Sequence, residues 1–158
     1  MNDSNNEFYT FRGYAKQHQG LTPSMEDYLE MIFRLSQNKF YTRINDLASA
    51  LNVQPPSATK MVQKLAELNY LKYEKYGIIE LTPVGIEVGR LLLKRHEKLE
   101  TFLRLLGVQE NVLEDTEKIE HSLSEETLEC ICHFVEFMQA TPAYVDAFQK
   151  FPRKKDKE

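Results

Sequence analysis

Apolar residues recur along most of the chain at intervals of three and four, interrupted once by an alternating segment. The three- and four-residue spacing predicts amphipathic helices. It occupies residues 22–37, 43–71, 82–107, 110–121 and 124–138. Residues 70–82 alternate between apolar and polar side chains around a turn near Lys75 to Gly77, which predicts a β-hairpin. The sequence therefore predicts a mainly α fold with one small β element.

The first of these helices has two competing start signals. Thr22 followed by Pro23 suits an N-cap and a first helical residue. Ser24 with Asp27 three residues later offers a capping box instead. The pattern leaves both starts open.

Residues 43–71 predict two helices joined by a short turn. The first carries Ile44, Leu47, Ala48 and Leu51 on one side, and the second begins at the pair of prolines after Gln54. Helix, short turn and helix make a helix-turn-helix pattern. The hairpin of residues 70–82 follows directly and predicts a wing, so this part of the chain reads as a winged helix-turn-helix.

The outward side of the second helix carries residues that can meet DNA. They are Ser57, Thr59, Lys60, Gln63 and Lys64. Such donors and acceptors suit base edges and phosphates. Lys75, at the tip of the wing with Lys72 and Tyr76 nearby, could reach backbone phosphates. The alternative is an ordinary polar face in contact with solvent.

Composition places the chain among soluble globular proteins, with 42% hydrophobic and 28% charged residues. No apolar run approaches membrane-spanning length, and the N-terminus has neither the basic start nor the apolar stretch of a signal peptide. We therefore expect a cytoplasmic protein with no membrane partner. Cys130 and Cys132 should point to opposite faces of one helix and make poor partners for one metal ion.

The net charge of −4 does not by itself indicate a nucleic-acid binder, but the charges are segregated along the chain. Residues 57–75 carry a local charge of +2, whereas residues 110–129 carry eight acidic residues against Lys118 alone. A local basic face can hold phosphate on an acidic protein. The acidic segment requires a separate explanation.

Six polar residues on three predicted helices form a candidate metal-binding set. They are Asp27, Glu30, His96, Glu117, Glu120 and His121. Four carboxylates and two imidazoles suit a divalent ion such as Mn²⁺ or Fe²⁺, whereas structural zinc usually prefers sulfur. Each residue also has an ordinary alternative: a helix cap for Asp27, an ion pair with Arg34 for Glu30, a core position for His96, and a solvated acidic face for the rest.

Five segments, in this order, resemble the diphtheria-toxin-repressor family of metal-dependent regulators. They are TPSMEDYLE, PPSATKMVQKL, YLKYEKY, RHEKLETFLRLLGV and EKIEH, within about residues 22–140. The resemblance implies a winged helix-turn-helix domain, an all-helical dimerisation domain and a two-ion site between them. It carries the ligand roles to the same six residues. The iron-responsive branch is similar but has a methionine and a cysteine at the positions of Asp27 and Glu117. Oxygen ligands in place of sulfur therefore favour the manganese branch here.

The resemblance also implies what the chain binds and does. Its partners would be a second copy of the chain, a palindromic double-stranded DNA operator and divalent ions, with two Mn²⁺ per chain, Fe²⁺ as the alternative, and Zn²⁺ or other ions binding in vitro. Its activity would be repression of metal-transport genes, and it would not be an enzyme. DNA-facing positions carried over by motif are Pro56, Ser57, Thr59, Lys60 and Gln63.

These observations predict four segments. They are a flexible arm at 1–21, a winged helix-turn-helix domain at 22–83, a helical metal-binding and dimerisation domain at 84–142, and a tail at 143–158. Two other functions remain open. A winged-helix regulator that senses a small organic ligand would bind no stoichiometric metal. A di-metal carboxylate enzyme would need a repeated E-x-x-H pair, but Lys118 stands three residues before His121.

Overall fold

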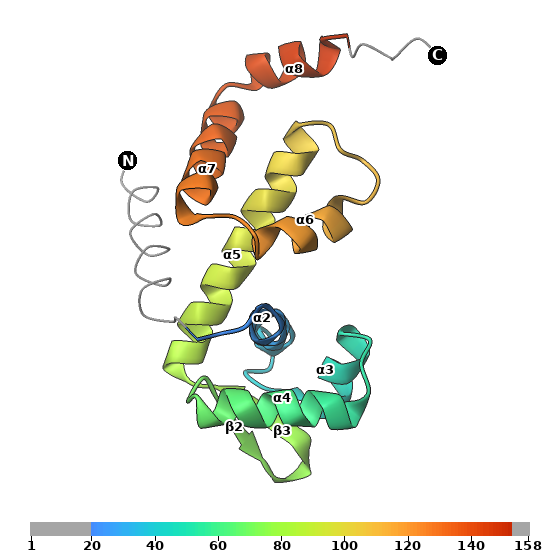
Figure 1. Ribbon diagram of the computed structural model, residues 1–158, viewed down its shortest axis with the longest axis vertical. Coiled ribbons are helices and arrows are strands. Elements are labelled where there is room, and N and C mark those ends of the chain that lie inside the picture. Colours follow the sequence, from blue (N-terminus) through green and yellow to red (C-terminus); the bar gives the residue numbers. More distant parts are fainter. Residues whose placement is uncertain (1–19, 153–158) are drawn as a thin grey trace. The chain divides into compact units, whose positions relative to one another are not determined.

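The computed structural model describes residues 20–152 (Figure 1). The expectations for most of the N-terminal arm and for the last six residues lie outside this part of the chain. The chain divides into two compact units, one ending at Lys94 and the other beginning at Arg95. Each is described below by itself.

The first unit begins with helix α2, Pro23–Ser36. Its N-cap is Thr22, whose hydroxyl accepts a hydrogen bond from the backbone N–H of Met25 at 3.3 Å. The Thr22–Pro23 signal, rather than the capping box at Ser24, therefore starts the helix. Leu29 and Ile32 are fully buried, as their spacing predicts.

The helix-turn-helix consists of α3, Ile44–Ala50, and α4, Pro55–Glu67. The turn between them is tied back to α3 by a 2.9 Å hydrogen bond from the Val53 N–H to the Ala48 carbonyl. Ala48 and Ala58 are both buried, and small side chains allow the two helices to pack closely. This confirms the predicted motif.

The wing consists of β2, Leu71–Glu74, and β3, Ile78–Leu81, joined by a short 3-10 turn, η1, Lys75–Gly77. The two strands pair antiparallel, with Tyr73 opposite Ile79. A two-residue strand that the sequence pattern did not predict, β1, Thr42–Arg43, joins the other edge of β3, so that the sheet order is β1-β3-β2. Figure 1 shows α4 and the wing side by side.

Helix α5, Pro83–Leu105, begins where the wing ends. Thr82 fixes this junction: its hydroxyl shares its proton between the Asn69 carbonyl at 2.8 Å and the Tyr70 carbonyl at 3.0 Å, and accepts from the Gly85 N–H at 3.1 Å. A side chain at Gly85 would place its Cβ 1.8 Å from the Tyr70 carbonyl oxygen. This close approach of two backbone segments requires glycine.

The second unit contains the C-terminal part of α5 and three further helices. They are α6, Val112–Glu120; α7, Glu125–Ala140; and α8, Pro142–Lys150. Ser124 caps α7 by accepting from the Thr127 N–H at 3.2 Å. Leu99, Thr116 and Val135 are fully buried in this unit.

The second unit differs from the sequence pattern in two places. Helix α8 was not predicted, and none of its residues is buried. Phe137, an apolar residue of the helix predicted at 124–138, is half exposed and stacks on Tyr144 with ring centroids 5.6 Å apart. Cys132 is buried and Cys130 exposed, which confirms that they point to opposite faces. Within residues 20–152, no helix combines the length and apolar character needed to cross a membrane.

Candidate metal centre and nucleic-acid interface

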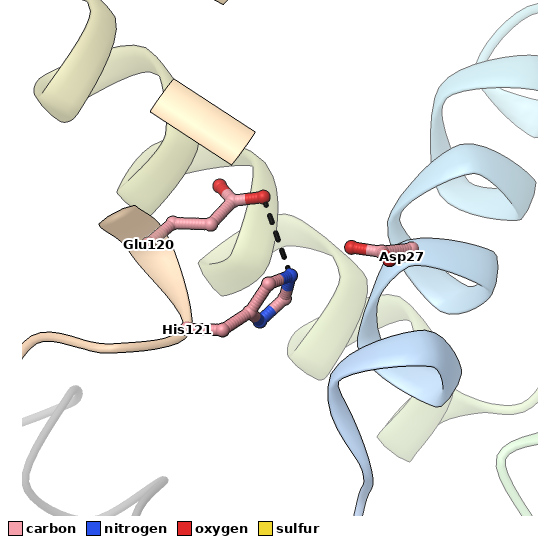
Figure 2. Close-up of side chains that lie close together, drawn as sticks. All are labelled: Asp27, Glu120 and His121. Atoms are coloured by element: carbon pink, nitrogen blue, oxygen red, sulfur yellow. Dashed lines mark ion pairs between the residues drawn. The ribbon is translucent and has the colours of Figure 1, made fainter. Parts of the chain in front are cut away.

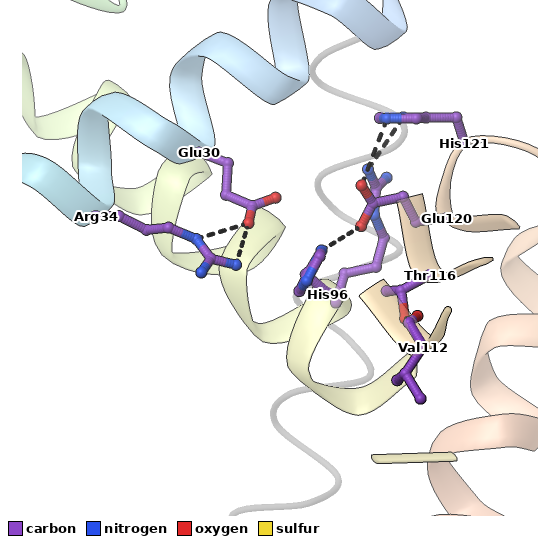
Figure 3. A network of polar contacts seen from close by, with 8 residues as sticks. Glu30, Arg34, His96, Val112, Thr116, Glu120 and His121 are labelled. Atoms are coloured by element: carbon purple, nitrogen blue, oxygen red, sulfur yellow. Dashed lines mark hydrogen bonds and ion pairs between the residues drawn. The ribbon is translucent and has the colours of Figure 1, made fainter. Parts of the chain in front are cut away.

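The second unit brings three of the six candidate ligands together around one carboxylate. Glu120 is the last residue of α6, His121 is its C-cap, and His96 projects from α5. The His96 Nδ1 lies 3.1 Å from Glu120 Oε2, and the His121 Nε2 lies 3.6 Å from Glu120 Oε1. Figure 3 shows the first contact and Figure 2 the second. The two oxygens of Glu120 thus face two different imidazoles.

Two of the three residues in this cluster are buried, and His121 is partly buried. Glu120 is 4% exposed and His96 is 7% exposed. A buried carboxylate is costly unless hydrogen-bonded or paired with positive charge. Carboxylate oxygen and imidazole nitrogen are also the donors that bind Mn²⁺, Fe²⁺ and Zn²⁺. The donor chemistry of the cluster therefore fits a divalent ion.

Glu117 behaves differently from Glu120. It lies on α6 one turn earlier and is exposed to solvent. The helical spacing of EKIEH correctly places these residues on one helix, but tertiary packing buries only one of the two carboxylates.

The remaining acidic residues of α6 include an ordinary surface ion pair. Lys118 Nζ lies 2.6 Å from Glu114 Oε1, and both side chains are largely exposed. The hydrogen bond from Lys118 lowers the pKa of the Glu114 carboxyl, and the same contact raises the pKa of Lys118. The solvated-face alternative concerned Glu117, Glu120 and His121; it agrees with the exposure of Glu117 but not with the burial of Glu120.

Arg95 is a residue at this cluster that the sequence did not single out. Its Nη2 lies 3.5 Å from His121 Nδ1. The only sequence signal was its position next to His96. The contact makes Arg95 a neighbour of one candidate ligand.

The first unit carries the other two candidate ligands on α2. Asp27 and Glu30 are three residues apart, so they share one side of the helix. Glu30 is 8% exposed and accepts two hydrogen bonds from Arg34, at 2.9 Å from Nε and 2.6 Å from Nη2 (Figure 3). The ion pair expected as the alternative role of Glu30 is therefore present.

The candidate DNA-facing residues occupy the outer side of α4. Pro56, Ser57, Lys60, Gln63 and Lys64 are exposed, whereas Ala58, Val62 and Leu65 on the opposite side are buried. The start of α4 offers few backbone donors to a phosphate, because Pro55 and Pro56 have no N–H and the Ser57 N–H bonds to the Gln54 carbonyl at 2.9 Å. The candidate DNA contacts on this face are therefore side chains, and Lys60 and Lys64 carry its positive charge.

Two of the DNA-facing candidates need separate comment. The Thr59 hydroxyl donates to the Pro55 carbonyl at 3.0 Å, so its proton is committed to the helix and its oxygen can only accept. Lys75 begins the wing turn η1, but its side chain lies outside the described part of the structure.

Comparisons with known proteins match both parts of the chain. Residues 20–79 match the iron dependent repressor N-terminal DNA binding domain. Residues 82–147 match the iron dependent repressor metal binding and dimerisation domain. Relatives named HTH-type transcriptional regulator MntR include one from Geobacillus thermodenitrificans, 46% identical over 85% of this chain and 96% of the relative. Another, from Lysinibacillus sphaericus, is 50% identical over 78% of this chain and 90% of the relative.

Solved structures agree. The manganese regulator SloR superposes with a TM-score of 0.63 at 28% identity, covering 74% of this chain and 55% of SloR. The structure of IdeR from T. acidophilum gives 0.62 at 30% identity, covering 70% of this chain and 53% of IdeR. The chain therefore spans about half the length of these two proteins. Both domain descriptions are those of a regulator and not of an enzyme. The chain belongs to the iron-dependent repressor, or diphtheria-toxin-repressor, family of metal-dependent transcriptional regulators.

Proposed function

We propose that this regulator senses Mn²⁺ and represses genes for metal transport when Mn²⁺ is plentiful. The ion would be held by Asp27, Glu30, His96, Glu117, Glu120 and His121, at two ions per chain. The observation that carries this proposal is the buried Glu120 carboxylate with an imidazole at each oxygen. The names of the relatives, which include a manganese regulator, support Mn²⁺ over Fe²⁺.

The proposed mechanism is electrostatic. Without metal, the four carboxylates would repel one another, which would disfavour their assembly into one site. Two divalent ions would bring positive charge to the cluster and link α2 of the DNA-binding domain to α5 and α6 of the dimerisation domain. In a homodimer, that link would fix the spacing of the two α4 helices. Recognition helices must enter major grooves about 34 Å apart, or a multiple of it, to bind a palindrome. Metal would thus shift the population toward the DNA-competent dimer.

Calorimetric titration of the metal-free protein with Mn²⁺ tests the metal site. We expect about two ions per chain in the parent and a clear loss of binding in the Glu117→Ala/His121→Ala double variant. Circular dichroism and thermal unfolding of that variant without metal should show that it still folds, because Glu117 is exposed and His121 lies at the C-terminal end of α6. Absence of stoichiometric binding by the parent would contradict the proposal and favour a sensor of a small organic ligand.

The DNA-binding role of α4 predicts a charge-dependent loss. Lys60→Ala should weaken binding to DNA selected from a random library with Mn²⁺ present by about 1–3 kcal/mol if Lys60 contacts a base. If Lys60 contacts a phosphate, the substitution should instead reduce the slope of log affinity against log salt concentration by about one unit. Fluorescence anisotropy at several salt concentrations distinguishes the two. Lys150→Ala is the control, because Lys150 is an exposed lysine on α8 paired with Asp146. Equal affinities for parent and Lys60→Ala at all salt concentrations would exclude this face.

A further inference from the structure

The ion pair between Arg34 and Glu30 lies at one of the proposed metal ligands. Both Arg34 donors, Nε at 2.9 Å and Nη2 at 2.6 Å, converge on the same carboxylate oxygen, Oε1. Glu30 is buried, with 10% of its side chain exposed, whereas 38% of the Arg34 side chain is exposed. The guanidinium therefore places a full positive charge directly beside the buried carboxylate.

We propose that Arg34 competes with the metal for Glu30 and so lowers the affinity of the sensor for its ion. This inference rests on the proposed role of Glu30 as a ligand. In the metal-free protein the guanidinium supplies the counter-charge that a buried carboxylate needs. When a divalent ion binds Glu30, the same guanidinium either stays and repels the ion or leaves the carboxylate. If it stays, binding is weakened because like charges a few ångströms apart repel strongly at low dielectric. If it leaves, binding is weakened by the loss of the ion pair with Glu30.

A neutral hydrogen-bonding partner would act in the opposite direction. Partners that hydrogen-bond a metal ligand usually orient it, and their removal weakens metal binding by about 10- to 100-fold. Arg34 differs because it carries a charge of the same sign as the ion. The two roles therefore predict changes of opposite sign, which makes the inference testable.

The chain supplies a matched control for this pair. Arg104 binds Glu100 with the same i,i+4 spacing and the same two donors on Oε1, at 2.9 Å from Nε and 2.7 Å from Nη2. That pair is more exposed, with 56% of Arg104 and 26% of Glu100 accessible, and Glu100 is not among the proposed ligands. Arg104→Gln thus removes an equivalent surface pair without touching the metal site.

The experiment is a Mn²⁺ titration by calorimetry of the full chain and of three variants: Arg34→Gln, Arg34→Lys and Arg104→Gln. We expect Arg34→Gln to bind Mn²⁺ about tenfold more tightly at unchanged stoichiometry, a change of the size seen for other residues next to ligands. Arg34→Lys keeps the charge without the two-donor fork and should stay close to the parent. Arg104→Gln should also match the parent.

Thermal unfolding supplies a second readout, in which the difference between the Mn²⁺-bound and the metal-free protein separates this role from a purely structural one. Without metal, Arg34→Gln should unfold at a lower temperature than the parent, because buried Glu30 loses its counter-charge. With saturating Mn²⁺ it should gain more stability than the parent gains, since the ion then replaces that charge. Equal or weaker Mn²⁺ affinity in Arg34→Gln, with the parent binding normally, would overturn this inference alone. Absence of Mn²⁺ binding in the parent would overturn it together with the proposed function.

Discussion

Replacing Glu120 with glutamine should abolish the Mn²⁺-dependent gain in DNA affinity while leaving the protein folded. The Glu120 carboxylate has an imidazole at each oxygen, 3.1 Å from His96 and 3.6 Å from His121. Glutamine keeps the shape and can still hydrogen-bond to imidazole, but it carries no negative charge to balance a divalent ion. Mutation of a residue that hydrogen-bonds to a metal ligand typically lowers metal affinity by about 10- to 100-fold. Loss of the charge on a buried ligand itself should therefore lower Mn²⁺ affinity by roughly 100-fold or more.

The measurement is fluorescence anisotropy of a DNA fragment selected in the presence of Mn²⁺, with and without the ion. Glu114→Gln is the matched control, since it makes the same change on the same helix at a side chain that only pairs with exposed Lys118. Circular dichroism and thermal unfolding of both variants without metal verify the fold. A normal Mn²⁺ response in Glu120→Gln would exclude this residue as a ligand.

The second large effect is expected at Gly85, where the wing meets α5. Gly85→Ala should destabilise the first unit by ~3 kcal/mol, the upper end of what overpacking costs. The added Cβ would lie 1.8 Å from the Tyr70 carbonyl oxygen, and that carbonyl also accepts from the Thr82 N–H and hydroxyl. Neither backbone segment can yield without breaking these hydrogen bonds. Denaturant unfolding of the metal-free protein measures the loss.

Val84→Ala is the control for the junction. Val84 is the neighbouring residue on α5 and is 45% exposed, so its truncation should change stability by less than about 0.5 kcal/mol. A loss in Gly85→Ala no larger than that in Val84→Ala would show that the start of α5 moves freely away from Tyr70. The close contact would then be unnecessary for the fold.

Local signals predicted most of the secondary structure correctly. Helix α2 begins at the Thr22–Pro23 signal, α4 begins at its proline pair, and the wing turns at Lys75–Gly77. These features depend on residues close together in the sequence: a side-chain cap, a fixed proline φ, and a turn in which Tyr76 and Gly77 take positive φ. Strand β1 escaped prediction because two residues have no periodicity, and only pairing with β3 defines them.

For the candidate site, too, some features follow from the sequence alone and others only from the tertiary structure. The sequence by itself determined the donor types, oxygen and nitrogen without sulfur, and placed Glu117, Glu120 and His121 on one helical segment. Only the tertiary structure decided that Glu120 is buried between two imidazoles while Glu117 stays exposed, and that Arg95 reaches His121. Spacing fixes which residues share a helix, but burial depends on which other helix packs against them, and no local pattern records that choice.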